Sequence, residues 1–156
     1  MGCWPKPRAR RSAALPPVFG GGSMAIRRHL ADVYGISDDR VVATSGVSSG
    51  LALVFATLAR RNDHVLIERP GYQPFEDMAR AAGLQAEGFV RGGPQMRPDL
   101  ADLRKRLRPK TRMIVLSHLH NPTGLPLLDS DLAALAELCE AAGIWLVLDE
   151  IYGAFA

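Results

Sequence analysis

Residues 117–152 read SHLHNPTGLPLLDSDLAALAELCEAAGIWLVLDEIY. The stretch predicts a strand that ends in a polar loop, then a helix, then a second strand that ends in an acid and a tyrosine. A βαβ unit of this kind has parallel strands, so both strand ends reach the same edge of the sheet. We therefore expect Asn121 and Asp149, 28 positions apart, to face one crevice. Open α/β sheets bind ligands at that edge.

Strands and helices are also expected to alternate along the rest of the chain. Strands are expected at 41–45, 64–68, 84–90, 112–117 and 144–149. Helices are expected at 24–34, around 51–58, around 75–82, at 98–107 and around 132–139. Pro98 should lie in the first turn of its helix, and Asp129 or Ser130 should be the N-cap of the last one. The alternation predicts the α/β class, a three-layer αβα arrangement with a mostly parallel sheet.

The composition is that of an ordinary globular protein. Of 156 residues, 47% are hydrophobic and 22% are charged, which is enough apolar surface to form a core. The net charge is +3, but four of the nineteen basic residues lie in the first 26 positions, where there is no acid. The remainder carries fifteen basic and sixteen acidic residues. Because this body is nearly neutral, no nucleic-acid partner is expected.

The N-terminal head and the cysteines exclude several classes of protein. Residues 1–23 are rich in Pro, Gly, Ala and Arg and show no hydrophobic period, so a disordered or atypical head is expected. The head lacks the apolar segment of a signal peptide, and no run of the chain is suited to span a membrane. Cys3 and Cys139 form no disulfide framework, which favours a reducing, cytoplasmic location.

The first candidate site is residues 44–50, TSGVSSG, which lead a strand into a helix N-terminus. Backbone N–H groups, the helix dipole and small hydroxyl side chains together favour binding of an anion such as phosphate. The segment lacks both the Gly-Lys-Ser/Thr of a P-loop and the G-x-G-x-x-G of a dinucleotide site. A plain serine N-cap is the alternative.

Two further loops follow strands. Tyr72 in Pro70-Gly71-Tyr72 could stack on a planar ligand, or it could serve only as a hydrophobic residue at a helix start. Asn121 opens the loop NPTG, where its amide could bond a ring oxygen or simply belong to a turn. His118 and His120 lie beside it, but no Cys or acid completes a ligand set, so no metal is expected.

The fourth candidate site is DEIY, residues 149–152, at the end of the apolar strand IWLVLD. A carboxylate at the end of such a strand is costly to bury unless a cation or a strong donor faces it. A protonated heterocyclic nitrogen in the crevice would satisfy Asp149. A salt bridge or a helix cap is the alternative.

Together these four motifs resemble the class I/II aminotransferases, which are pyridoxal-phosphate enzymes of fold type I. Order and spacing match from about residue 24 to the end, and HNPTG followed one helix later by DEIY is the most specific pair. The resemblance implies that residues 24–156 are part of the large, cofactor-binding domain. It also implies transfer of an amino group between an amino acid and a 2-oxo acid, pyridoxal 5′-phosphate as cofactor, no membrane partner, and a homodimer.

The resemblance assigns the phosphate and the face of the cofactor ring. Val47 and Ser48, together with Ser49, match the turn that binds the phosphate. Tyr72 matches the aromatic residue that stacks on the pyridine ring. These four residues are therefore expected to bind the cofactor on one side of the crevice.

The resemblance also assigns the ring's polar atoms. Asn121 matches the asparagine that hydrogen-bonds the ring hydroxyl, and Tyr152 matches the tyrosine that shares it. Asp149 matches the carboxylate that pairs with the pyridine nitrogen. By keeping that nitrogen protonated, Asp149 would let the ring accept electrons from the substrate.

The sequence departs from the family pattern in its lysines. The family's Schiff-base lysine lies well beyond the aspartate, whereas the lysines of this chain are Lys6, Lys105 and Lys110. None of them is placed to reach the cofactor, and the small C-terminal domain is missing. We therefore expect a fragment without a catalytic lysine, inactive by itself in transamination.

Several alternatives stay open. Carbon–sulfur lyases, cyclopropane-carboxylate synthases and aminotransferase-like regulators share this core. Tyr152, where some lyases carry histidine, favours an aminotransferase, and a head of 23 residues is too short for a regulator's winged helix. Outside the family, the chain could be a non-catalytic relic of the fold. A nucleotide-binding domain would need a better glycine-rich loop than TSGVSSG.

Overall fold

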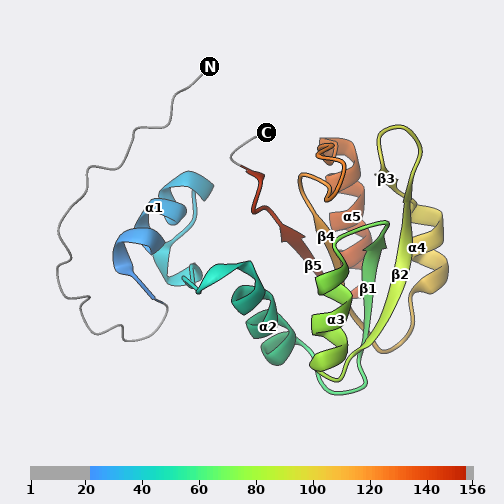
Figure 1. Ribbon diagram of the computed structural model, residues 1–156, viewed down its shortest axis with the longest axis horizontal. Helices are drawn as coiled ribbons and strands as arrows, with labels where there is room; N and C mark the ends of the chain where they lie inside the picture. Colours follow the sequence, from blue (N-terminus) through green and yellow to red (C-terminus); the bar gives the residue numbers. More distant parts are fainter. Residues whose placement is uncertain (1–21, 154–156) are drawn as a thin grey trace. The chain divides into compact units, whose positions relative to one another are not determined.

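The computed structural model describes residues 22–153 (Figure 1). The chain forms two compact units that divide between Thr44 and Ser45. In the first, helix α1 (Met24–Tyr34) ends at a left-handed Gly35 and is followed by the short helix η1 (Asp38–Arg40). The Arg27 guanidinium joins helix α1 to helix η1, because its Nε and Nη2 donate to the Asp38 carbonyl at 3.0 and 2.6 Å. The predicted irregular head falls outside the described residues, apart from Gly22 and Ser23.

The second unit is a five-stranded sheet covered by helices. Its helices are α2 (Gly46–Leu58), α3 (Gln73–Ala81), α4 (Leu100–Arg106) and α5 (Asp129–Ala142). Its strands are β1 (His64–Arg69), β2 (Gln85–Gly92), β3 (Arg97–Pro98), β4 (Thr111–Ser117) and β5 (Trp145–Asp149). The strand order is β3-β2-β1-β4-β5, and every pairing is parallel except the short antiparallel one between β2 and β3. This confirms the predicted α/β class and the mostly parallel sheet.

Side chains alternate between two cores, one on each face of the sheet. Val65 and Met113 point to the face where α2 and α3 pack through Phe55 and Phe75. Residues one position along the strands point to the opposite face, where α4 and α5 pack through leucines such as Leu135. Figure 1 shows α3 and α5 on opposite sides of the strands. Two buried faces explain the continuous apolar runs in the middle of the central strands, 65–67 in β1 and 113–116 in β4.

The β4–α5–β5 unit has the geometry that the sequence predicts. In the parallel register Ser117 lies opposite Asp149, and the His118 N–H donates to the Asp149 carbonyl at 2.8 Å. Helix α5 ends at a left-handed Gly143. Both strands therefore end at one edge of the sheet, and the loops that follow them begin side by side.

The predicted strand at 41–45 is wrong. Val41 has extended dihedral angles, but residues 41–44 carry no strand pairing and Ser45 already caps α2. β-Branched residues favour extended backbone, yet a strand forms only where a neighbouring strand supplies hydrogen bonds.

Two predicted helix starts are also wrong. Pro98 belongs to β3, and the N-cap of α4 is Asp99, whose carboxylate accepts from the N–H groups of Ala101 and Asp102 at 2.9 Å. The Asp99 carboxylate accepts from two backbone N–H groups of the first helical turn, whereas a proline side chain has no acceptor for them. At α5 the N-cap is Leu128, so neither Asp129 nor Ser130 has that role.

None of the described helices is long and apolar enough to cross a membrane. The Cys139 thiol lies in the core beneath α5, and burial raises its pKa to about 11. A thiol with so high a pKa carries almost no thiolate at neutral pH, so Cys139 acts as a small hydrophobic residue.

A buried histidine lies at the amino end of β1. The His64 ring bonds the Thr111 hydroxyl through Nδ1 at 2.9 Å and Glu87 through Nε2 at 3.2 Å. Burial lowers the pKa of His64, and the Arg108 guanidinium lowers it further, against the opposing effect of Glu87. The folded protein therefore disfavours protonation of this ring.

This histidine predicts a pH-dependent stability. Below its ordinary pKa of about 6.5 the unfolded chain binds a proton that folded His64 resists, so the free energy of unfolding should fall as the pH drops through that value. Thermal unfolding between pH 7.5 and 5.5 measures the effect. His64→Gln should flatten the profile, whereas His29→Gln, at an exposed position of α1, should keep it. Equal slopes for the two variants would refute the assignment.

Candidate functional site

A cavity of about 220 Å³ opens where β4 and β5 end and α2 begins. Six of the seven residues predicted to bind a ligand line it, although they come from four separate segments: Val47, Ser48, Tyr72, Asn121, Asp149 and Tyr152. Ser45, Gly46 and Ile151 complete the lining and were not singled out in the sequence, although each lies within a motif that was. The seventh predicted residue, Ser49, does not line this cavity; its hydroxyl donates to the Ser45 carbonyl at 2.9 Å.

The N-terminus of α2 forms one wall of the cavity. Its N-cap residue Ser45 makes no side-chain cap hydrogen bond, and the first turn contains no acid. The N–H groups of a helix's first turn have no partner within the helix, and the helix dipole adds partial positive charge there. With the Ser48 hydroxyl beside them, these groups can bind an anion.

Asp149 and Asn121 also line the cavity. The Asp149 Oδ1 accepts from the Ile151 N–H at 3.0 Å, which fixes the carboxylate at the end of β5. The Asn121 N–H donates to the Ser117 hydroxyl at 3.0 Å, which fixes the start of the NPTG loop. Tyr152 lines this cavity and an adjoining hollow of about 310 Å³ together with Asn121. A carboxylate, an amide and a phenol therefore converge on one small space.

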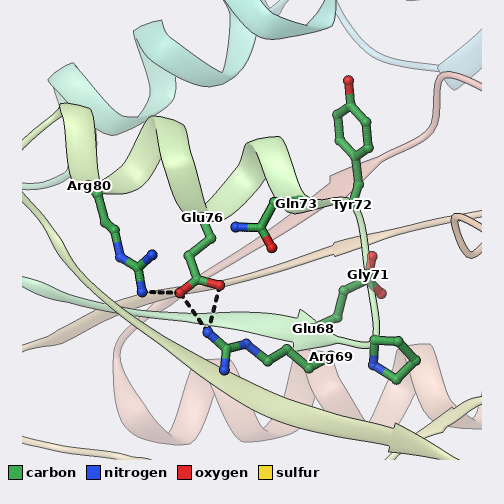
Figure 2. Close-up of a pocket in the computed structure, with 8 residues that line it drawn as sticks. Glu68, Arg69, Gly71, Tyr72, Gln73, Glu76 and Arg80 are labelled. Atoms are coloured by element: carbon green, nitrogen blue, oxygen red, sulfur yellow. Dashed lines mark hydrogen bonds and ion pairs between the residues drawn. The ribbon is translucent and has the colours of Figure 1, made fainter.

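Tyr72 stands on a turn between this cavity and a larger hollow of about 540 Å³. Its ring meets Phe75 edge to face, with ring centroids 5.3 Å apart. Figure 2 shows the Tyr72 side chain directed away from a cluster in the larger hollow, where Glu76 binds Arg69 at 2.6 Å and also Arg80. The arginines of this hollow are thus already paired.

Comparisons with known proteins agree with this geometry. The family model for aminotransferase class I and II matches residues 20–156. This chain belongs to the aminotransferase class I and II family. It is 33% identical to a valine–pyruvate aminotransferase of Mycobacterium tuberculosis, over 81% of this chain and 32% of that protein. It is 29% identical to an arginine–pyruvate transaminase of Pseudomonas aeruginosa, over 84% of this chain and 35% of that protein.

A solved structure shares the fold as well. The N-succinyldiaminopimelate aminotransferase of Mycobacterium tuberculosis superposes with a TM-score of 0.77 at 29% identity, over 85% of this chain and 37% of that one. The chain thus spans about a third of the length of the family members that it matches. Three relatives whose names contain three different amino compounds match it about equally well, so overall similarity does not indicate a substrate.

In this family member the two histidines beside Asn121 tie loops together. The buried His120 ring bonds the Pro70 carbonyl through Nε2 at 2.9 Å and the Thr123 hydroxyl through Nδ1 at 2.7 Å. His118 Nδ1 accepts from the Leu127 N–H at 3.0 Å. Among residues 22–153, no cluster of three or more His, Cys, Asp or Glu side chains could hold a metal ion. His120 thus links the Tyr72 turn to the Asn121 loop.

Gly71 lies against the end of β1. A Cβ atom there would lie 2.5 Å from the Glu68 Cγ and 2.7 Å from the Glu68 carbonyl oxygen. Because the carbonyl cannot move without breaking the end of β1, Gly71→Ala should lower the free energy of unfolding by about 1–3 kcal/mol. Chemical denaturation measures this. Gly92→Ala is the matched control, because its Cβ would meet only the Val90 side chain at 3.7 Å; equal losses would contradict the clash.

Proposed function

We propose that this chain forms the pyridoxal 5′-phosphate site of an enzyme that transfers an amino group between an amino acid and a 2-oxo acid. The observation that carries the proposal is the single cavity lined by Ser48, Tyr72, Asn121, Asp149 and Tyr152. Membership of the aminotransferase class I and II family supports it.

The chemistry of the lining residues fits the cofactor. The first-turn amides of α2 and the Ser48 hydroxyl suit a phosphate dianion. The Asp149 carboxylate suits a protonated ring nitrogen, and the Asn121 amide with the Tyr152 phenol suits a ring hydroxyl. Tyr72 would cover one face of the ring. Each polar part of the cofactor therefore has a complementary group in the cavity.

When bound, the cofactor supplies an electron-accepting ring for chemistry at the substrate's α-carbon. The residues of this chain bind and orient that ring. Asp149 holds a proton on the ring nitrogen, which keeps the ring electron-poor. The α2 N-terminus holds the phosphate, which prevents the ring from sliding along the cavity.

The phosphate contact offers a direct test. The chain should bind pyridoxal 5′-phosphate measurably in equilibrium dialysis, and pyridoxal, which lacks the phosphate, about tenfold or more weakly, since a charge-assisted hydrogen bond contributes about 1.5–3 kcal/mol. Equal affinities for the two compounds, or no binding of either, would contradict the proposed function.

The lysines of the chain predict how the cofactor is held. Lys105 lies on α4, and Lys110 lies in the turn before β4, at the amino end of the strand, whereas the cavity lies at the carboxyl ends. We therefore expect the 156-residue chain to bind the cofactor without a covalent bond and to show no transamination. Borohydride reduction followed by peptide mass spectrometry should find no stoichiometric label; specific labelling of Lys105 or Lys110 would overturn this prediction.

Two other functions remain as alternatives within this proposal. A related pyridoxal-phosphate lyase would use the same cavity and bind the same cofactor, so that product analysis of an enzyme containing this domain would separate the two. A non-catalytic relic would fold but fail to bind pyridoxal 5′-phosphate. A homodimer is proposed from the family resemblance, and a cytoplasmic location is proposed from the cysteine content.

A further inference from the structure

A buried ion pair joins the neighbouring strands β1 and β2. Glu68, the fifth residue of β1, and Arg91 of β2 are both fully buried, and Arg91 Nη1 donates to Glu68 Oε2 at 2.7 Å. Arg91 is also oriented by two carbonyl groups, those of Met96 at 2.6 Å and Ser117 at 3.1 Å. Its Nη2 has no hydrogen-bond partner within the part of the chain that the structure describes. The Nη1 group thus contacts both Glu68 and Ser117.

The second oxygen of Glu68 reaches the Asn121 loop through one serine. Glu68 Oε1 accepts from the Ser117 N–H at 2.9 Å and from the Ser117 hydroxyl at 2.5 Å. The same hydroxyl accepts from the Asn121 N–H at 3.0 Å. A carboxylate can only accept and a backbone N–H can only donate, so the hydroxyl has one possible orientation. The order Arg91, Glu68, Ser117, Asn121 is therefore a fixed chain of hydrogen bonds.

This arrangement sets geometry rather than contributing much stability. A buried ion pair gains little free energy over well-packed apolar side chains, because both charges lose their hydration. Ser117, however, is held at its N–H, its hydroxyl and its carbonyl at once. It also lies opposite Asp149 in the β4–β5 register. Ser117 thus neighbours both Asn121, through its hydroxyl, and Asp149, through the strand pairing.

We propose that Glu68, oriented by Arg91, is a positioning residue that fixes Asn121 toward the cavity through the Ser117 hydroxyl. The part of this inference that concerns the cofactor rests on the proposed function. Neither Glu68 nor Arg91 needs to touch the cofactor for this role. Their effect on binding passes entirely through the backbone of Asn121.

The test removes the hydroxyl in the middle of the chain of hydrogen bonds. In Ser117→Ala, hydrogen exchange of the Asn121 amide, followed by NMR, should become about tenfold faster or more, since one hydrogen bond is lost. Ser130→Ala, at an exposed position of α5, is the matched control and should leave the rate unchanged. Ser117→Cys preserves the side-chain volume but bonds weakly, so it should behave like Ser117→Ala. Unchanged exchange in both variants would overturn the proposal.

Binding of pyridoxal 5′-phosphate supplies a second readout. Ser117→Ala should weaken it about tenfold in the otherwise unchanged chain and by less than about twofold in an Asn121→Ala background, because the serine acts only through Asn121. Equal losses in the two backgrounds would mean a general structural effect and would overturn the positioning role. Faster exchange at Asn121 in a chain that binds no pyridoxal 5′-phosphate would support the positioning of Asn121 and contradict the proposed function alone.

Discussion

Glu68→Gln should lower the free energy of unfolding by about 3–5 kcal/mol, the usual cost of removing one partner of a buried ion pair. The variant leaves the Arg91 charge in a site with no exposed surface and no counterion. The glutamine amide also replaces one of the two accepting oxygens with an NH2 group, so that donors face either Arg91 or Ser117. Urea denaturation followed by circular dichroism measures the loss.

The double variant Glu68→Gln/Arg91→Met separates the cost of an unpaired charge from the cost of altered packing. Removing the second charge should recover most of the lost stability, since an apolar side chain replaces an unpaired cation. Glu137→Gln, which removes an exposed charge from α5, should change the stability by less than about 0.5 kcal/mol. A loss below about 1 kcal/mol for Glu68→Gln would show that water reaches the pair, contrary to the structure.

The sequence predicts the parallel sheet well because the sheet depends on local patterns. Short apolar runs alternate with helical stripes, and β4–α5–β5 needs only the rule that crossovers join parallel strands. Val41–Ser45 has the same local pattern, but it does not form a strand. Whether an extended segment becomes a strand depends on a neighbour that is distant in sequence, and local propensity carries no information on that neighbour.

The same distinction separates the predicted parts of the site from those that were missed. Asn121 and Asp149 could be brought together in advance because one βαβ unit joins them. The pairing of Glu68 with Arg91 depends on the β1–β2 register, and their link to Ser117 depends on the pairing of β1 with β4. The sequence therefore offers only a weak signal, a charge within or beside an apolar strand. Ser49 was proposed for the cavity, but its hydroxyl instead bonds back within α2.

Asp149→Asn should weaken binding of pyridoxal 5′-phosphate about 10- to 100-fold, the equivalent of one hydrogen bond to a charged group. The substitution keeps an oxygen that can accept from the Ile151 N–H, as Oδ1 does at 3.0 Å, so the end of β5 should retain its conformation. What disappears is the negative charge that favours a protonated ring nitrogen. Fluorescence titration of the two proteins with the cofactor measures the loss. Asp129→Asn, the same change at an exposed position outside the cavity, should leave the affinity unchanged.

A thermodynamic cycle of two proteins and two ligands tests this prediction further. The second ligand is an analogue of the cofactor in which a C–H group replaces the ring nitrogen. The unchanged chain should bind the analogue more weakly than the cofactor, because the Asp149 carboxylate then faces no donor. Asp149→Asn should bind the analogue at least as well as the unchanged chain does, because neither partner of the ion pair remains. If the substitution weakened binding of the cofactor and the analogue equally, Asp149 would act on the shape of the cavity and not on the ring nitrogen, and its assignment as the nitrogen's partner would be wrong.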